Sequence, residues 1–189
     1  MFNHNKFRLF TIKTLILIII LTIFICKSSF AQGWFPLNSG TTATCNGVFF
    51  LDANTGYINL TDDGNGHFLK TTNAGRRWSD LTNLPVPATD WQRAVFFTDV
   101  NTGYITSSDN LDTGNIYKTI NGGANWVPLT LPVHKQFCSI SFINSNTGYV
   151  CGWQVILKTT NAGTTWVSQS FPGGVEWLWS ICFVNANTG

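Results

Sequence analysis

KTTNAGTTW, residues 158–166, is the third copy of a nine-residue string in this chain. The string also occurs as KTTNAGRRW at 70–78 and as KTINGGANW at 118–126. A longer unit surrounds each copy and opens with VFFLDANTGY at Val48, VFFTDVNTGY at Val95 and ISFINSNTGY at Ile140, and a fourth opening, ICFVNANTG, begins at Ile181. Successive units start 47, 45 and 41 residues apart. A repeat of this period indicates a solenoid, a propeller or an array of stacked units.

Each unit is built from short apolar and β-branched runs separated by Gly, Asn, Asp and Thr, which is typical of strands and tight turns. We expect the VFF-type run to be the first strand and the Tyr after the NTG turn to open the second. HFLKTT, NIYKTI and VILKTT read as third strands, and the Trp that ends the nine-residue string opens the fourth. Four antiparallel strands per unit is the pattern of a propeller blade. The sequence therefore predicts an all-β fold, a partial β-propeller with three full blades and the start of a fourth.

The repeated residues have structural roles in this prediction. The Gly of each NTG turn is expected to adopt a positive φ. In the second turn, the Thr hydroxyl and the Asn amide can bond the turn's own backbone, the Gly takes a left-handed conformation, and the Trp buries against the hairpin and the neighbouring sheet. The repeated structural positions are Gly56, Tyr57, Asn73, Gly75, Trp78, Gly103, Tyr104, Asn121, Gly123, Trp126, Gly148, Tyr149, Asn161, Gly163 and Trp166.

The hairpin strings resemble the Asp-box (BNR-like) motif, S/T-x-D/N-x-G-x-T-W, of sialidases and other propellers. The longer unit, F-x-D-x-N-T-G-Y followed by K-T-T-N-x-G-x-x-W, resembles the repeats of the photosystem II assembly and stability factor family and of related exported bacterial proteins. The resemblance covers residues 33–189. It implies a propeller that acts as a protein-binding scaffold with an arginine-rich surface, and the arginines after residue 31 are Arg76, Arg77 and Arg93.

The N-terminus has the layout of a secretory signal peptide at residues 1–31. Basic residues precede an apolar run at 15–25, and Ser29 and Ala31 stand at the −3 and −1 positions of a cleavage site. The alternative is a retained membrane anchor, for which the run is short. Cleavage would leave a propeller domain at 32–189 with seven Lys and Arg against nine Asp and Glu, a net charge of −2. We expect a secreted, periplasmic or cell-surface protein with no integral membrane span after cleavage and no basic patch for nucleic acid.

Two connections in each unit keep their length, and two vary. Because strands alternate in direction, the two constant turns must share one rim of the propeller and the two variable connections the other. Variable loops on one face of a repeat protein are where ligands usually bind. This variable rim comprises residues 61–66, 88–93, 107–114, 152–154 and 173–179. Its candidate binding residues are Asp90, Trp91, Arg93, Trp153, Glu176 and Trp177.

Three functional hypotheses remain open from the sequence. The first is a non-catalytic scaffold that binds a protein or another macromolecule. The second is a glycan-active or glycan-binding propeller of the Asp-box kind, sialidase- or xyloglucanase-like, in which Asp90 and Glu176 would be the carboxylate pair that glycoside hydrolysis needs. The third is a structural module of a larger surface protein. Trp91 and Trp177 suit sugar or peptide groups, and packing at the sheet ends is their structural alternative. The sequence shows no metal-ligand spacing, nucleophile elbow or cofactor motif.

Four cysteines follow residue 31, namely Cys45, Cys138, Cys151 and Cys182. Cys138 and Cys151 flank the first hairpin of the third unit at similar distances from its turn, so a disulfide between them is predicted. The chain stops where every earlier unit continues with Tyr, and we expect the natural gene to encode further blades. GWFPLN, from Gly33, has the spacing of a fourth strand, which we expect to lie beside the first blade here and to complete the final blade in a closed ring.

Overall fold

The computed structural model describes residues 39–62, 65–81, 84, 86–87, 90–109, 111, 113–172, 174 and 176–189. The regular structure in these ranges is entirely β-strand. The predicted signal peptide and most of the predicted N-terminal strand lie outside them. No helix of bilayer-spanning length and hydropathy occurs in the described part of the chain.

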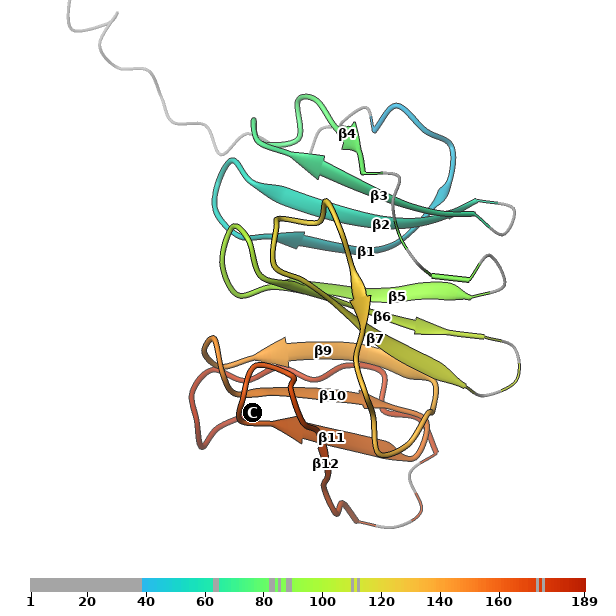
Figure 1. The fold of residues 1–189 in the computed structure, drawn as a ribbon, viewed down its shortest axis with the longest axis vertical. Helices are drawn as coiled ribbons and strands as arrows, with labels where there is room; N and C mark the ends of the chain where they lie inside the picture. The colour runs from blue at the N-terminus through green and yellow to red at the C-terminus, as the bar shows by residue number, and fades with distance from the viewer. Residues whose placement is uncertain are drawn as a thin grey trace, which may run out of the picture. The chain divides into compact units, whose positions relative to one another are not determined.

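Within the described ranges, twelve strands form three four-stranded antiparallel sheets, each made of consecutive strands (Figure 1). The first blade contains β1 (Thr44–Phe50), β2 (Gly56–Asp62), β3 (Asn65–Thr71) and β4 (Ser79–Asp80). The second contains β5 (Trp91–Phe97), β6 (Gly103–Ser108), β7 (Gly114–Thr119) and β8 (Val127–Pro128). The third contains β9 (Phe137–Phe142), β10 (Gly148–Gly152), β11 (Val155–Thr159) and β12 (Val167–Ser168). The predicted propeller fold is confirmed, with one blade per sequence unit.

The glycine of each NTG turn is needed for space and not for a left-handed backbone. None of Gly56, Gly103 and Gly148 has a positive φ, so that prediction was wrong. A Cβ at any of the three would instead lie 2.5–2.6 Å from the ring of the Phe that ends the first strand of the same blade. The ring crosses over the glycine, which explains why Phe and Gly recur at a constant spacing.

The second turn of each unit forms as its residue types predicted. In the second blade, Thr119 Oγ1 accepts the N–H of Gly123 at 3.0 Å, and Asn121 Oδ1 accepts the N–H of Asn125 at 2.8 Å. Gly75, Gly123 and Gly163 have φ values of 78°, 94° and 80°. The Trp does not open the fourth strand, which begins one residue later.

The two constant turns of each blade lie together on one rim, as predicted. The N–H of Ala74 in the second turn donates to the carbonyl of Asn54 in the first turn at 2.9 Å. The same bond joins Gly122 to Asn101 at 2.8 Å and Ala162 to Asn146 at 2.9 Å. One hydrogen bond per blade therefore fastens the two constant turns to each other.

Blades are joined by an aromatic contact that repeats along the stack. Tyr57 of the first blade stacks on Phe97 of the second with ring centroids 3.6 Å apart, and Tyr104 stacks on Phe142 of the third at 4.2 Å. Each Phe also meets the Trp of its own blade edge-on, with centroids 6.1 Å apart for Phe97–Trp126. Trp126 and Trp166 are therefore buried between sheets, as predicted, whereas Trp78 of the first blade is only partly buried.

The lysine that begins the first and the second nine-residue string also spans the blades. Lys118 Nζ donates to the carbonyl of Ala162 in the next blade at 2.7 Å, and Lys70 Nζ donates to that of Gly122 at 3.4 Å. The Lys70 ammonium lies 5.3 Å from the Tyr57 ring centroid. The string thus encodes a hairpin together with its attachment to the following hairpin.

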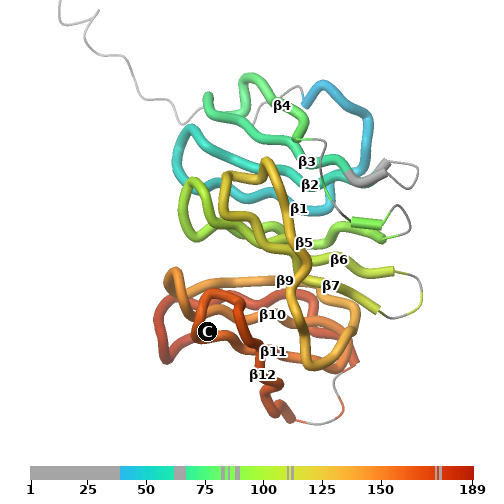
Figure 2. Tube along the Cα trace, in the orientation of Figure 1, coloured from blue at the N-terminus to red at the C-terminus, as the bar shows by residue number. Residues whose placement is uncertain are grey.

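The fourth unit forms only its first turn. The N–H of Val184 donates to the carbonyl of Thr188 at 3.0 Å, as in the earlier units, and Phe183 stacks on Tyr149 at 4.2 Å. In Figure 2 the tube of this segment, in red, runs beside the third blade. Residues 181–189 therefore cover the third blade as the start of a next blade would.

Candidate functional site

The variable rim is assembled around the β10–β11 connection of the third blade. The N–H of Gln154 donates to the carbonyl of Glu176 at 2.9 Å, and the N–H of Leu178 donates to that of Gly152 at 3.2 Å. These bonds attach the segment after the third blade to the end of β10. The prediction that the two variable connections share a rim is confirmed in this blade.

Three tryptophans gather on this attachment. Trp153 and Trp177 face each other as an antiparallel bridge, with ring centroids 6.5 Å apart. Trp177 and Trp179 stack almost parallel, with centroids 4.9 Å apart and planes 12° apart. Trp179 is 66% exposed. Lys135 places its ammonium 4.3 Å from the centroid of Trp153. We call Lys135, Trp153, Trp177 and Trp179 the tryptophan platform.

The platform has a tightly packed base. The N–H of Trp153 donates to the carbonyl of Gln136 at 2.9 Å. A Cβ on Gly152 would collide with that same carbonyl, so only glycine allows the two backbones to approach this closely. The backbone therefore holds the tryptophans in position while part of their aromatic surface stays exposed.

A second aromatic–cation pair lies at the start of β5. The guanidinium carbon of Arg93 stands 4.8 Å from the ring centroid of Trp91, which is 42% exposed. Arg93 Nε also donates to Ser108 Oγ at 2.9 Å, which fixes the guanidinium. The variable rim thus carries two places where a cation covers a tryptophan.

Asp90 does not present its carboxylate to solvent. It is 7% exposed, and its Oδ2 accepts the hydroxyl of Ser107 at 3.0 Å. Burial and the Asp90 charge raise the pKa of Tyr117. Asp90 therefore belongs to a buried polar cluster between strands, and its carboxylate has a structural partner.

The loop after β6 is shaped by Asp109. Its carboxylate accepts the side-chain hydroxyl and the N–H of Thr113 and the N–H of Leu111, and these bonds lower the pKa of Asp109. Its carbonyl accepts Gln136 Nε2 at 3.1 Å. This loop is thereby tied to the segment that carries Lys135.

The six predicted binding residues fall into two groups. Trp153, Glu176 and Trp177 come together in the third blade, and Asp90, Trp91 and Arg93 come together in the second. Asp90 accepts the hydroxyl of Ser107 in the second blade, whereas the carbonyl of Glu176 accepts the N–H of Gln154 in the third. Lys135 and Trp179 were missed, although Trp179 could have been found, because EWLW places its two tryptophans on one side of an extended chain.

The disulfide predicted between Cys138 and Cys151 is not formed. Both thiols are free, as are those of Cys45 and Cys182. The register places Ser139 opposite Cys151, and Cys138 is an extra residue in a β-bulge. Burial raises the pKa of Cys138, and burial with the neighbouring Cys138 raises the pKa of Cys151 to about 12.

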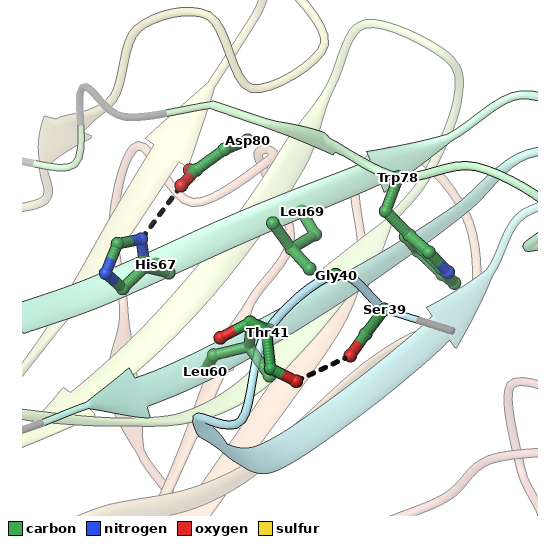
Figure 3. Close-up of a pocket in the computed structure, with 8 residues that line it drawn as sticks. All are labelled: Ser39, Gly40, Thr41, Leu60, His67, Leu69, Trp78 and Asp80. Atoms are coloured by element: carbon green, nitrogen blue, oxygen red, sulfur yellow. Dashed lines mark hydrogen bonds and ion pairs between the residues drawn. The ribbon is translucent and has the colours of Figure 1, made fainter. Parts of the chain in front are cut away.

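A pocket of about 340 Å³ lies on the first blade, away from all six predicted residues (Figure 3). Its lining combines Leu60, Leu69 and Trp78 with Ser39, Gly40, Thr41, His67 and Asp80. His67 Nδ1 lies 2.9 Å from Asp80 Oδ2. Ser39 Oγ donates to the carbonyl of Thr41 at 3.1 Å, and in Figure 3 the dashed line for this bond lies apart from the dashed line that joins His67 to Asp80. The pocket therefore holds the residue types of a hydrolase triad without their hydrogen-bond relay.

In the described ranges, no three His, Cys, Asp or Glu side chains lie close enough together to hold a metal ion. The acidic side chains of the first turns have backbone partners instead. For example, Asp52 Oδ1 accepts the N–H groups of Asn54 and Thr55, and these bonds lower the pKa of Asp52.

Comparison with known proteins identifies the fold. No family model and no curated protein matches the chain. Among solved structures, it resembles YCF48 bound to D1 peptide (TM-score 0.59, 20% identity, covering 72% of this chain and 45% of that one). It also resembles the GH74 enzyme of Niastella koreensis (TM-score 0.57, 19% identity, covering 71% of this chain and 24% of that one). A third similar structure is YCF48 from Cyanidioschyzon merolae (TM-score 0.55, 16% identity, covering 71% of this chain and 42% of that one). The chain spans less than half the length of each of these three proteins.

Proposed function

We propose that this chain is a non-catalytic propeller scaffold that binds a protein partner on its variable rim. The observation that carries the proposal is the tryptophan platform, where three indoles and one ammonium are held on hydrogen-bonded backbone with Trp179 66% exposed. Trp and Arg are the residue types that most often dominate protein-binding energies. The Trp91–Arg93 pair adds a second contact point on the same rim.

The indoles of the tryptophan platform are already held in position before a ligand binds. Stacking and the backbone bonds at Gly152 and Gln154 already restrict the indoles, so binding would cost little additional side-chain entropy. The opposite rim consists of nearly identical turns, which offer little basis for specificity. A structural neighbour, YCF48, is known bound to a peptide, which supports a protein ligand for this fold.

The finer assignments from sequence belong to the same proposal. The T-x-N-x-G-x-x-W hairpins act as Asp-boxes that staple blades together, and the repeats are of the photosystem II assembly-factor type. A cleaved signal peptide at 1–31 would deliver the domain to the periplasm, the cell surface or the medium. The partner is then a protein or macromolecule of that compartment.

Selection from a random peptide phage library on the immobilised chain tests this function. The variant Trp177→Ala/Trp179→Ala should weaken a selected peptide at least about tenfold, because it deletes the exposed stack. A matched control is Ile120→Ala, which removes a 73% exposed apolar side chain next to the conserved turns. It should leave affinity unchanged.

Thermal unfolding of the same variants separates binding from packing. A platform that binds loses affinity on substitution and keeps its melting temperature within a few degrees. A destabilised double variant with unchanged peptide affinity would show that the tryptophans only pack, and the proposed site would be wrong.

Glycan binding is the second candidate function. The nearly parallel Trp177–Trp179 stack presents a flat aromatic face of the kind that suits a sugar ring, and Glu176 lies beside it, exposed. Titration with neutral oligosaccharides, followed by tryptophan fluorescence, tests this candidate. Saturable binding of an oligosaccharide, together with a phage selection that yields no binding peptide, would favour glycan binding over protein binding.

A further inference from the structure

We propose that Cys138 and Cys151 form a redox-sensitive thiol pair, and that oxidising it to a disulfide releases the tryptophan platform from an anchor at Leu178. The thiol pair stands on geometry alone. The consequence for binding rests on the proposed function of the platform.

The β-bulge in β9 puts both thiols on one face of the third blade. Phe137, Ile140 and Phe142 all pack in the core shared with the second blade. In a regular strand, residues 137 and 140 would point to opposite faces. The bulge resets the alternation, so Cys138 and Ser139 both point away from that core. Cys151, directly opposite Ser139, points the same way, because its neighbour Val150 lies in the core.

This placement makes the two thiols neighbours on one face of the blade. Directly paired residues of antiparallel strands have Cβ atoms about 4.5–5.5 Å apart, and at a bulge two residues face one. Electrostatic repulsion from Cys138 is one cause of the raised pKa of Cys151, in agreement with close approach. Cys138 is half-buried and reachable by a small oxidant, whereas Cys151 is buried.

Cys151 is also bonded to the platform. Its Sγ–H donates to the carbonyl of Leu178 at 3.3 Å. Leu178 lies between Trp177 and Trp179, and two further backbone bonds, from Gln154 and to Gly152, hold the same segment. A thiol consumed in a disulfide has no proton to donate, so oxidation removes one of these three attachments.

The pair is specific to the third blade. The positions of Cys138 and Cys151 in the register correspond to Asn46 and Asn59 in the first blade and to Arg93 and Thr106 in the second. The first and second blades form without these thiols, so the pair is not needed to hold a blade together.

The chemistry balances with a small-molecule disulfide as oxidant. The Cys138 thiolate attacks one sulfur of oxidised glutathione and releases one glutathione thiolate. The Cys151 thiolate then attacks Cys138 Sγ, forms the intramolecular bond and releases the second glutathione. Two protein thiols lose two protons and two electrons, and the oxidant becomes two thiols. Because both pKa values are raised, exchange should be slow at neutral pH and faster in alkaline buffer.

Thiol counting tests the pair. In a Cys26→Ser/Cys45→Ser/Cys182→Ser background, oxidised glutathione should lower the free thiols from two to none, with no glutathione retained in the product mass. Adding Cys151→Ser to that background should leave a stable glutathione adduct on Cys138. Two unreacted thiols after prolonged exposure at alkaline pH, or a stable adduct when both cysteines are present, would overturn the proposal.

Acrylamide quenching of tryptophan fluorescence tests the coupling. The oxidised protein should show a larger quenching constant than the reduced protein, because the Trp177–Trp179 segment is held less firmly. Cys151→Val removes the donor without forming a disulfide and should reproduce the increase, whereas Cys151→Ser, which keeps a hydroxyl donor, should not. Equal quenching in reduced, oxidised and Cys151→Val proteins would overturn the coupling. If quenching changes while peptide affinity does not, the platform is not the binding site, and the thiol pair still stands.

Discussion

At the scale of single residues, side chains stabilise the turns in which they lie or which they adjoin. Thr119 Oγ1 accepts a hydrogen bond from the N–H of Gly123, and Asn121 Oδ1 accepts one from the N–H of Asn125. Phe97 lies where a Cβ of Gly103 would be. These contacts are local in sequence, so they can form in any blade whatever its neighbours do.

Asn121→Ala should lower the free energy of unfolding by about 1–2 kcal/mol, because the N–H of Asn125 loses a strong acceptor and the turn loses its cap. Urea unfolding followed by tryptophan fluorescence measures this loss. Asn101→Ala is the matched control, since Asn101 is exposed and bonds Asp99 through its backbone N–H, which alanine keeps. Equal losses in the two variants would contradict the capping role.

At the scale of strands and blades, the repeated Tyr and Lys act across an interface. Tyr104 Oη donates to the carbonyl of Ala162 in the next blade at 2.9 Å, beside Lys118 Nζ. The hydroxyl of Tyr57, at the same position in the first blade, has no partner among the described residues. Burial raises the pKa of both tyrosines to about 12, so both hydroxyls keep their protons at neutral pH.

This difference predicts that a Tyr→Phe substitution affects stability differently at positions 104 and 57. Tyr104→Phe should cost about 1 kcal/mol, because it removes an inter-blade hydrogen bond. Tyr57→Phe should be neutral or slightly stabilising, because it removes a buried hydroxyl that is not bonded in the described structure. Chemical denaturation of both variants provides the comparison, and an equal loss in each would contradict this account of the interface.

At the scale of the whole molecule, burial depends on which blade has a neighbour. Phe50 and Phe97 occupy the same repeat position, yet Phe50 is 43% exposed and Phe97 1%. Val48 and Val95 differ in the same way. Among the described residues, the first blade has no preceding sheet to cover the face that the other two blades pack against a neighbour.

Phe97→Ala should therefore destabilise the chain by about 3–5 kcal/mol, as expected for a buried aromatic residue. Phe50→Ala should cost a small fraction of that amount, because its ring is already partly hydrated. Thermal unfolding of the two variants measures the ratio. Similar losses would show that something covers the first blade in solution.

The candidate site was only partly predictable. Their place on the variable rim predicts Trp153 and Trp177 as binding residues, and the two lie together as a bridge. Lys135 was missed because it lies before β9 while Trp153 follows β10, so their contact leaves no local pattern in the sequence. Asp90 was chosen for its charge, but its carboxylate is buried and bonded to Ser107, a contact set by how β5 and β6 pair.

The sequence by itself determined the repeat, the four strands of each blade and the second turn, because each depends on residues close together in the chain. Only the tertiary structure decided that Gly56, Gly103 and Gly148 make room for a phenylalanine ring, that Cys138 falls in a bulge, and that Trp179 joins the platform. The physical reason is that register, bulges and contacts between blades are set by side chains meeting across strands. A periodic pattern specifies which face a residue takes only while the alternation is unbroken, and one extra residue in β9 is enough to change it.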